Sequence, residues 1–369
     1  MPRVTPIRGH ALRLVVYHVS TELGGLEESL ATLLRHLNPM IEVLLISNVP
    51  SLTRWFADQV PDLRVRHVAG VRGKWDVRGM LNHLRLIRGL KPDILQVELA
   101  TPWSGKYAVL AGLLAPRTRV IVDDYTGSPP PNRRDRWAKR ILMAGTDANV
   151  AVSNELARFI EDAAGLKRRT VRVIYQGISD PGPPAAGGQR HDPPVIGTIG
   201  RLTRQKGIDI FLRALADIPD VRGVIVGDGE DETELKELAA DLGVGQRVSW
   251  MGWREDARRF VDDFDIFVLA TRWEGLPRVL VEAAFAECPV ISTRVVGPSE
   301  AMIEGETGLL VPPEDKDSLV RAIITLLEDE ERAREMGRRG REFALSRFDP
   351  ATQAQEYEHL YDEIMARTS

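Results

Sequence analysis

Short apolar runs alternate with segments of helical periodicity along nearly the whole chain, and this alternation restricts its possible folds more than any other feature. In the first half the runs lie at residues 12–17, 41–46, 63–68, 94–97, 120–122, 148–152 and 171–174. Amphipathic segments lie between them at 26–37, 80–90, 107–114, 134–144 and 155–164. Runs of this length alternating with helices are typical of parallel strands joined by crossover helices. The first half is therefore predicted to be a doubly wound α/β sheet.

A second alternating set follows a stretch dense in proline and glycine at residues 179–194. Its apolar runs lie at 195–199, 221–226, 248–251, 265–269, 290–292 and 309–311. A chain of 369 residues is long for one core, and proline-glycine density marks a linker. We therefore predict domains at 1–178 and 195–348. The tail carries Tyr357, Leu360, Tyr361 and Ile364 on one helical stripe, so residues 349–369 are expected to pack back on the first domain.

The composition is that of an ordinary globular protein, with 43% hydrophobic and 28% charged residues. The single cysteine, Cys288, permits no disulfide within the chain, which fits a reducing compartment. The apolar run at residues 12–19 is too short and too interrupted for a signal sequence or a membrane span. We expect a cytoplasmic protein.

Charge is distributed unevenly along the chain. Residues 1–172 hold 26 Lys or Arg against 16 Asp or Glu, whereas residues 173–369 hold 23 against 37. The basic residues gather near two tryptophans, Trp75 and Trp137, and are Arg64, Arg66, Arg72, Lys74 and Arg78, then Arg133, Arg134, Arg136, Lys139 and Arg140. This pattern suits an anionic membrane surface or an anionic acceptor, and a solvated basic face is the alternative. Nucleic acid is not expected, because the usual recognition motifs are absent.

One loop stands out in the second half, in the stretch Glu-Gly-Leu-Pro-Arg-Val-Leu-Val-Glu at residues 274–282. Pro277 suits the first turn of a helix, which puts Glu274 and Gly275 on a loop at the carboxyl end of a strand, where ligands bind in open α/β sheets. If Pro277 begins the helix, Glu282 lies roughly 12 Å along the axis from Glu274. Two carboxylates so spaced suit a ligand with hydroxyls at both ends and an anionic middle. The alternative is a dipole-favourable glutamate and a solvated one.

Several further motifs stand in a fixed order around this stretch. They are Gly200-Arg201-Leu202 with Lys206-Gly207, Val226-Gly227-Asp228-Gly229, Phe264-Asp265-Ile266-Phe267-Val268, Gly297-Pro298-Ser299-Glu300 and Thr307-Gly308-Leu309-Leu310-Val311-Pro312. Together with Glu274 and Glu282, they resemble the donor-binding domain of family 4 glycosyltransferases. The resemblance implies a GT-B fold, in which two Rossmann-like doubly wound parallel-sheet domains face each other across a cleft and a C-terminal helix returns to the N-terminal domain.

The resemblance also implies roles for individual residues. Arg201 and Lys206 would stabilise the departing nucleotide diphosphate, Glu274 would bind the donor sugar and Glu282 the ribose hydroxyls. Backbone N–H groups from Gly275 to Arg278 would lie near the phosphates. The implied donor-binding residues are Gly24, Gly25, Gly200, Gly227, Gly275, Leu276, Pro277 and Glu282, and Glu300 is a third candidate carboxylate. Because cations would take the role of a divalent metal, no cofactor and no essential metal are expected.

Two positions depart from the family pattern. After the runs at 94–95 and 120–122, where relatives commonly carry histidine, this chain has Gln96-Val97-Glu98 and Asp123-Asp124-Tyr125. Glu98, Asp123 and Asp124 become candidates for orienting the acceptor hydroxyl, with ordinary strand-end carboxylates as the alternative. The loop at residues 21–27, which opens the first helix with Gly24 and Gly25, lacks the third glycine of the dinucleotide fingerprint. A plain turn is its alternative interpretation.

The function implied is retaining transfer of a sugar from a UDP- or GDP-sugar to an acceptor hydroxyl. The setting expected from the breadth of the family is bacterial cell-envelope polysaccharide, lipopolysaccharide or glycolipid synthesis, with a glycan or lipid-linked acceptor at the cytoplasmic face of the inner membrane. Two alternatives stay open from the sequence. One is a sugar-nucleotide epimerase of similar architecture, and the other is a noncatalytic sugar-nucleotide binding protein.

Overall fold

The structure is a computed structural model, and it describes residues 11–20, 23–71, 76–99, 101, 105–125, 132–182 and 191–367. Contacts divide the chain into two compact units, unit 1 with Met1–Gly177 and Asp349–Ser369, and unit 2 with Ile178–Phe348. The expected first domain, 1–178 with 349–369, differs from unit 1 by one residue. The expected linker at 179–194 belongs to unit 2, and its residues 183–190 lie outside the described residues.

Unit 1 is built on a parallel sheet of seven strands in the order β3-β2-β1-β4-β5-β6-β7. The strands are β1 (Arg13–Val19), β2 (Glu42–Ser47), β3 (Arg64–His67), β4 (Ile94–Leu99), β5 (Arg119–Asp124), β6 (Ala148–Ala151) and β7 (Val171–Val173). Every residue of the central strand β4 is buried, as expected for a strand covered on both faces. The direction of winding reverses between β1 and β4, which makes that pair the topological switch point.

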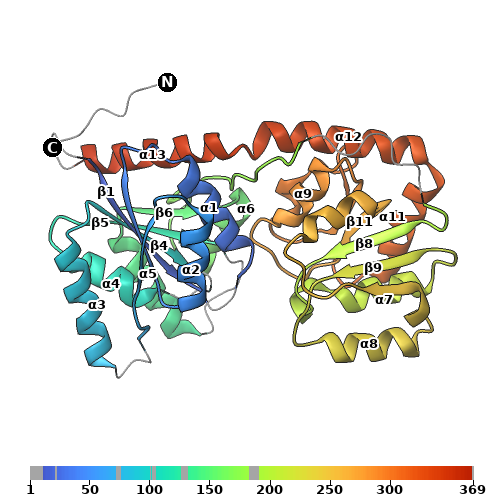
Figure 1. Cartoon of the computed structure of the whole chain (residues 1–369), viewed down its shortest axis with the longest axis horizontal. Helices are drawn as coiled ribbons and strands as arrows, with labels where there is room; N and C mark the ends of the chain where they lie inside the picture. Colours follow the sequence, from blue (N-terminus) through green and yellow to red (C-terminus); the bar gives the residue numbers. More distant parts are fainter. Residues whose placement is uncertain are drawn as a thin grey trace. The chain divides into compact units, whose positions relative to one another are not determined.

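Helices cover both faces of this sheet. They are α1 (Gly25–His36), α2 (Pro50–Gln59), α3 (Val77–Leu90), α4 (Lys106–Leu113), α5 (Arg133–Gly145), α6 (Asn154–Ala164) and α13 (Pro350–Ala366). The C-terminal helix α13 packs against α1, and Figure 1 shows the two on the same side of unit 1. Tyr357 and Tyr361 on α13 are fully buried in the core that α1 shares with β1 and β4. The amphipathic stripe of the tail therefore completes the core of unit 1.

Unit 2 contains a six-stranded parallel sheet in the order β10-β9-β8-β11-β12-β13. The strands are β8 (Val195–Ile199), β9 (Arg222–Val226), β10 (Val248–Trp250), β11 (Ile266–Leu269), β12 (Val290–Thr293) and β13 (Leu309–Val311). Here the winding reverses between β8 and β11. Both strands are buried throughout, in agreement with the apolar runs that predicted them.

The helical segments of unit 2 are η1 (Arg204–Lys206), α7 (Ile208–Ala216), α8 (Glu232–Asp241), η2 (Gly245–Arg247), η3 (Ala257–Asp263), α9 (Arg278–Phe285), α10 (Pro298–Ala301), α11 (Lys316–Glu328) and α12 (Glu330–Arg347). Helix α7 packs with α8 and α11, and α9 packs with α12 (Figure 1). Helix α12 is not among the helices that the sequence predicts. Among the described residues of the whole chain, no helix has the length and apolar content needed to cross a lipid bilayer.

Candidate active site at the switch point of unit 2

Two loops of unit 2 leave neighbouring strands at the switch point, residues 200–207 after β8 and residues 270–277 after β11. The strands run parallel with Ile196 opposite Ile266, so both loops emerge at the carboxyl edge of the sheet. That edge is where open α/β sheets bind ligands. The two loops carry Arg201, Lys206 and Glu274, the three residues expected to take part in catalysis.

Glycines bring the backbones of these loops into direct contact. Gly207 follows η1 with φ +65°, and a Cβ added there would overlap the carbonyl oxygen of Ala270. Gly227 follows β9 with φ +134°, and its Cβ would overlap the carbonyl oxygen of Gly200. Only glycine adopts these conformations without strain and leaves room for the neighbouring chain. The loops after β8, β9 and β11 are thereby held together at one corner of the sheet.

Lys206 and Glu274 meet across the gap between the two loops. Lys206 Nζ lies 2.5 Å from Glu274 Oε1, and the side chains are 16% and 10% exposed. Thr271 Oγ1 lies 3.1 Å from the same carboxylate oxygen. A charge pair so largely withdrawn from water needs this geometry, because each ion has lost most of its hydration. The structure thus joins two of the predicted residues directly.

The segment after Glu274 leads into helix α9. Gly275 and Leu276 are buried, and Pro277 is the N-cap of the helix, with φ −76° and ψ 100°. The helix begins at Arg278, one residue later than predicted from Pro277. Glu282 lies on its second turn, where Arg278 Nη2 is 3.4 Å from Glu282 Oε1. Glu282, the second predicted carboxylate, therefore pairs with an arginine of its own helix.

The remaining predicted residues of unit 2 lie on neighbouring loops. Arg201 is exposed on the loop after β8, five positions before Lys206. Glu300 is half-buried on the single-turn helix α10, which follows β12. Just before it, a Cβ at Gly297 would overlap the carbonyl oxygen of Gly275, so the loop after β12 also contacts the β11 loop.

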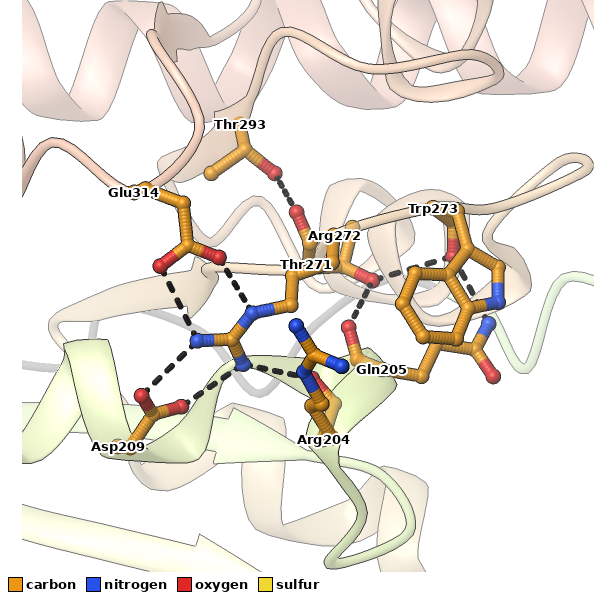
Figure 2. Close-up of polar contacts among 8 residues, drawn as sticks. All are labelled: Arg204, Gln205, Asp209, Thr271, Arg272, Trp273, Thr293 and Glu314. Atoms are coloured by element: carbon orange, nitrogen blue, oxygen red, sulfur yellow. Dashed lines mark hydrogen bonds and ion pairs between the residues drawn. The ribbon is translucent and has the colours of Figure 1, made fainter.

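Arg272 is the residue of this corner that the sequence analysis missed. Its Nη1 and Nη2 each lie 2.9 Å from a carboxylate oxygen of Asp209, Nη1 also donates to the carbonyl oxygen of Arg204 at 2.6 Å, and Nε and Nη2 bind Glu314. Figure 2 shows the guanidinium between these two carboxylates. The hydrogen bonds that Arg272 donates to Asp209 raise the pKa of Arg272. Burial alone would raise the pKa of Asp209, but the hydrogen bonds and charge of Arg272 lower it.

In unit 1, two of the candidate acceptor-orienting residues lie side by side. Glu98 on β4 is opposite Asp123 on β5, and their exposed fractions are 0% and 1%. Gln96 Nε2 donates to Glu98 Oε1 at 2.9 Å and to Asp123 Oδ2 at 2.6 Å, and Tyr361 of α13 donates to Gln96 Oε1 at 2.5 Å. Burial raises the pKa of Glu98. Burial, followed by the charge of Glu98, raises the pKa of Asp123 well above its ordinary value.

The other predicted residues of unit 1 lie at the end of β5 and at the start of α1. Asp124 is buried, and its Oδ2 lies 2.6 Å from Lys139 Nζ of α5. Gly24 and Gly25 are exposed at the start of α1, where Gly24 is the N-cap. Residues 21–22 of that loop lie outside the described residues. A buried histidine that the sequence analysis did not single out, His18 of β1, lies opposite Glu98 in the sheet, with Nε2 3.1 Å from Glu27 Oε1.

Within the described residues, no group of three or more His, Cys, Asp or Glu side chains is placed to hold a metal ion. The sequence does contain two Asp-x-Asp tripeptides, at residues 263–265 and 315–317. Asp265 Oδ2 accepts from the backbone N–H of Val195 at 2.7 Å, and Asp315 is the N-cap of α11, where Oδ1 accepts from Ser318 N at 2.9 Å. In each tripeptide, an aspartate therefore accepts a hydrogen bond from a backbone N–H group and stabilises the local backbone.

Two family descriptions match the chain, one in each half. "Glycosyltransferase Family 4" matches residues 23–180, and "Glycosyl transferases group 1" matches residues 184–343. The second match contains both loops of the candidate site.

Two relatives are similar to the chain in sequence, and one solved structure is similar to it in fold. The chain is 32% identical over 244 residues to the lipopolysaccharide core biosynthesis glycosyltransferase LpsE of Rhizobium meliloti (strain 1021), covering 63% of this chain and 70% of LpsE. It is 26% identical to the Vi polysaccharide biosynthesis protein VipC/TviE of Salmonella typhi, covering 80% of this chain and 57% of that protein. The structure of Anabaena Alr3699/HepE in complex with UDP-glucose shares the fold at a TM-score of 0.82 and 19% identity, covering 95% of this chain and 100% of that one.

Proposed function

The chain belongs to glycosyltransferase family 4, and from that premise we propose that it transfers a sugar from a UDP- or GDP-sugar to an acceptor hydroxyl with retention of anomeric configuration. The observation that carries the proposal is the Lys206–Glu274 pair, which lies where an anionic ligand is expected in this fold. The structural relative named above was solved with UDP-glucose, a donor of this class.

The hydrogen bonds of the Lys206–Glu274 pair leave some of its polar atoms available for the sugar-nucleotide donor. Among the described residues, the bonds of Glu274 go to Oε1, so in our proposal Oε2 accepts a hydroxyl of the transferred sugar. Lys206 gives one of its three N–H donors to Glu274, and the others can reach phosphate oxygens. Arg201, on the same loop, adds a second cation. Glu282 at the second turn of α9 takes the ribose hydroxyls.

In the proposed reaction, the bond between the anomeric carbon and the phosphate oxygen breaks while the acceptor oxygen bonds to the same face of that carbon. The acceptor proton passes to the departing phosphate. Lys206 and Arg201 stabilise the negative charge that develops on the nucleotide diphosphate. This assigns to two cations the charge neutralisation that a divalent metal supplies elsewhere, so the proposed reaction proceeds without an essential metal.

For the acceptor, we propose a glycan or lipid-linked glycan of the bacterial envelope, as the names of LpsE and VipC/TviE suggest. Helix α5 supports a contact with an anionic membrane. Its outer face exposes Trp137 (62%) and Ile141 (67%), with exposed arginines at 133, 134 and 140 around them. An apolar face bordered by arginines suits the interface of an anionic bilayer.

The test is acceptor-dependent turnover by the purified chain. A panel of nucleotide sugars is first screened by thermal shift, since a specific donor stabilises the fold by mass action. Wild type should then release free UDP or GDP only when a glycan acceptor is present, should keep this activity in EDTA, and should give a product whose anomeric configuration, read by NMR, equals that of the donor. Lys206→Ala and Glu274→Gln should each lower kcat by roughly 100-fold or more.

Lys236→Ala is the matched control, because Lys236 also forms a 2.5 Å pair with a glutamate but on the exposed surface of α8. Its kcat should equal that of wild type. Conversion of the sugar nucleotide without an acceptor would favour an epimerase. Tight donor binding without turnover, for every acceptor, would favour a binding protein.

A further inference from the structure

The guanidinium of Arg272 has no hydrogen-bond donor left for a ligand. An arginine carries five N–H donors. Nε donates to Glu314, Nη1 to Asp209 and to the Arg204 carbonyl oxygen, and Nη2 to Asp209 and to Glu314 (Figure 2). With its side chain 13% exposed, Arg272 lies close to the candidate phosphate site and yet cannot bind a phosphate without breaking one of these bonds.

The partners of Arg272 come from three places in unit 2. Asp209 lies in the first turn of α7, Arg204 begins η1, and Glu314 follows β13. Arg272 itself is three residues beyond the end of β11. One side chain therefore joins the loops after β8, β11 and β13, and the bidentate geometry to Asp209 fixes its orientation as well as its distance.

Further bonds tie the residues next to Arg272 to η1. The backbone N–H of Arg272 donates to the carbonyl oxygen of Gln205 at 2.7 Å, and Gln205 Nε2 donates to the carbonyl oxygen of Trp273 at 2.8 Å. Thr293 Oγ1 of β12 donates to the carbonyl oxygen of Thr271. Lys206 directly follows Gln205, and Glu274 directly follows Trp273. The bonded residues are therefore the immediate neighbours of the charged pair on both loops.

We propose that Arg272, held by Asp209 and Glu314, is a positioning residue that sets the geometry of Lys206 against Glu274. The inference rests on the proposed function, in which those two side chains contact the donor. Charge stabilisation in a transition state depends on placement to within about 1 Å, whereas binding of the ground state tolerates more. Loss of the Arg272 bonds should therefore affect turnover more than donor binding.

Arg272→Lys tests the proposal, because lysine keeps the charge but has three donors and no planar fork. The variant should lower kcat by roughly 10- to 100-fold while KM for the donor changes less than about threefold. Glu314→Gln, which keeps the pairing with Asp209, should give a smaller loss. Arg338→Lys is the matched control, since Arg338 also binds two glutamates, Glu335 and Glu342, on the exposed surface of α12.

A second readout does not depend on turnover. Hydrogen exchange at residues 270–277 should be faster in Arg272→Lys than in wild type and unchanged in Arg338→Lys. A folded Arg272→Lys variant with wild-type kcat, or a fall in kcat that merely follows the unfolded fraction with unchanged exchange, overturns the proposal. If wild type shows no transfer with any donor, the proposed function fails, and the exchange comparison still decides whether Arg272 holds the loop.

Discussion

At the scale of single residues, the carboxyl pair of Glu98 and Asp123 lies on two neighbouring strands in the interior of unit 1. Burial raises the pKa of Glu98, and burial with the charge of Glu98 raises the pKa of Asp123. A group whose pKa is higher in the folded than in the unfolded state binds more protons when folded. Its stabilising contribution is complete below the ordinary carboxyl pKa of about 4 and is lost as pH rises through the raised pKa.

Glu98→Gln should therefore stabilise unit 1 at pH 8 and have little effect near pH 4. The amide keeps the shape of the side chain without a charge that has to be buried. Each kcal/mol relieved should raise the melting temperature by roughly 2–4 °C. Thermal unfolding of wild type and variant between pH 4 and pH 8 measures the difference, with Glu237→Gln, exposed on α8, as the control. Parallel pH profiles for wild type and Glu98→Gln would contradict the prediction.

At the scale of elements, helix α12 packs through small residues. Its buried positions are Ala333, Met336, Gly337, Gly340 and Ala344, and charged residues occupy most of the rest. A Cβ at Gly337 would overlap the carbonyl oxygen of Glu287, two residues beyond the end of α9. A face built from glycine and alanine lets two backbones approach closely but gives almost no hydrophobic periodicity. This is why the apolar pattern does not predict the helix.

The two glycines of α12 allow a controlled test of this close approach. At Gly340 an added Cβ would lie 3.5 Å from the carbonyl oxygen of Thr307, an ordinary contact. Gly340→Ala should be neutral or stabilise by up to about 1 kcal/mol, since alanine favours a helix interior. Gly337→Ala gains the same propensity but must push α12 away from Glu287, so we expect a net loss of about 1–3 kcal/mol. Urea unfolding of both variants measures the difference, and equal stabilities would disprove the close-packing argument.

At the scale of the whole molecule, the two units differ in charge and in the surface they offer. Residues 1–172, which carry the basic excess, all belong to unit 1. In this unit, α5 exposes Trp137, Ile141 and several arginines. Lys139 of the same helix points inward to Asp124, so it does not add to that outer face. In the other basic cluster, near Trp75, residues 72–75 lie outside the described residues. The membrane contact proposed above therefore rests on α5.

Vesicle binding tests this contact with the intact chain. Sedimentation with anionic vesicles should exceed that with neutral vesicles and should weaken with salt, because arginines contribute to the attraction. Trp137→Ala should reduce binding by roughly tenfold, the effect of losing most of one buried aromatic ring. Trp253→Ala is the control, since Trp253 is 57% exposed in the acidic unit 2. Equal losses in both variants, or equal binding to neutral vesicles, would argue against α5 as the contact surface.

Much of the architecture could be predicted from local pattern. The apolar runs correspond to the strands of both sheets, because a strand buried on both faces must be apolar along its length. The order of motifs in the second half predicted the fold and the family, and parallel strands leave their loops at one edge. Lys206 and Glu274 were therefore expected near each other, although 68 positions separate them. The helix begins at Arg278 with Pro277 as its N-cap, which agrees with the expected start to within the one or two residues by which helix ends are defined.

Only the tertiary structure decided which side chains bind one another. Arg272 is 63 positions from Asp209 and 42 from Glu314, and no spacing rule relates residues that meet because three loops converge. The same holds for Glu98 and Asp123, which the sequence places at strand ends but whose shared partner Gln96 accepts a hydrogen bond from Tyr361, on the C-terminal helix α13. Hydrophobic periodicity acts over a few residues and so is readable in sequence. Hydrogen-bond saturation and loss of solvent depend on every element that packs around a group, and they exist only once the chain has folded.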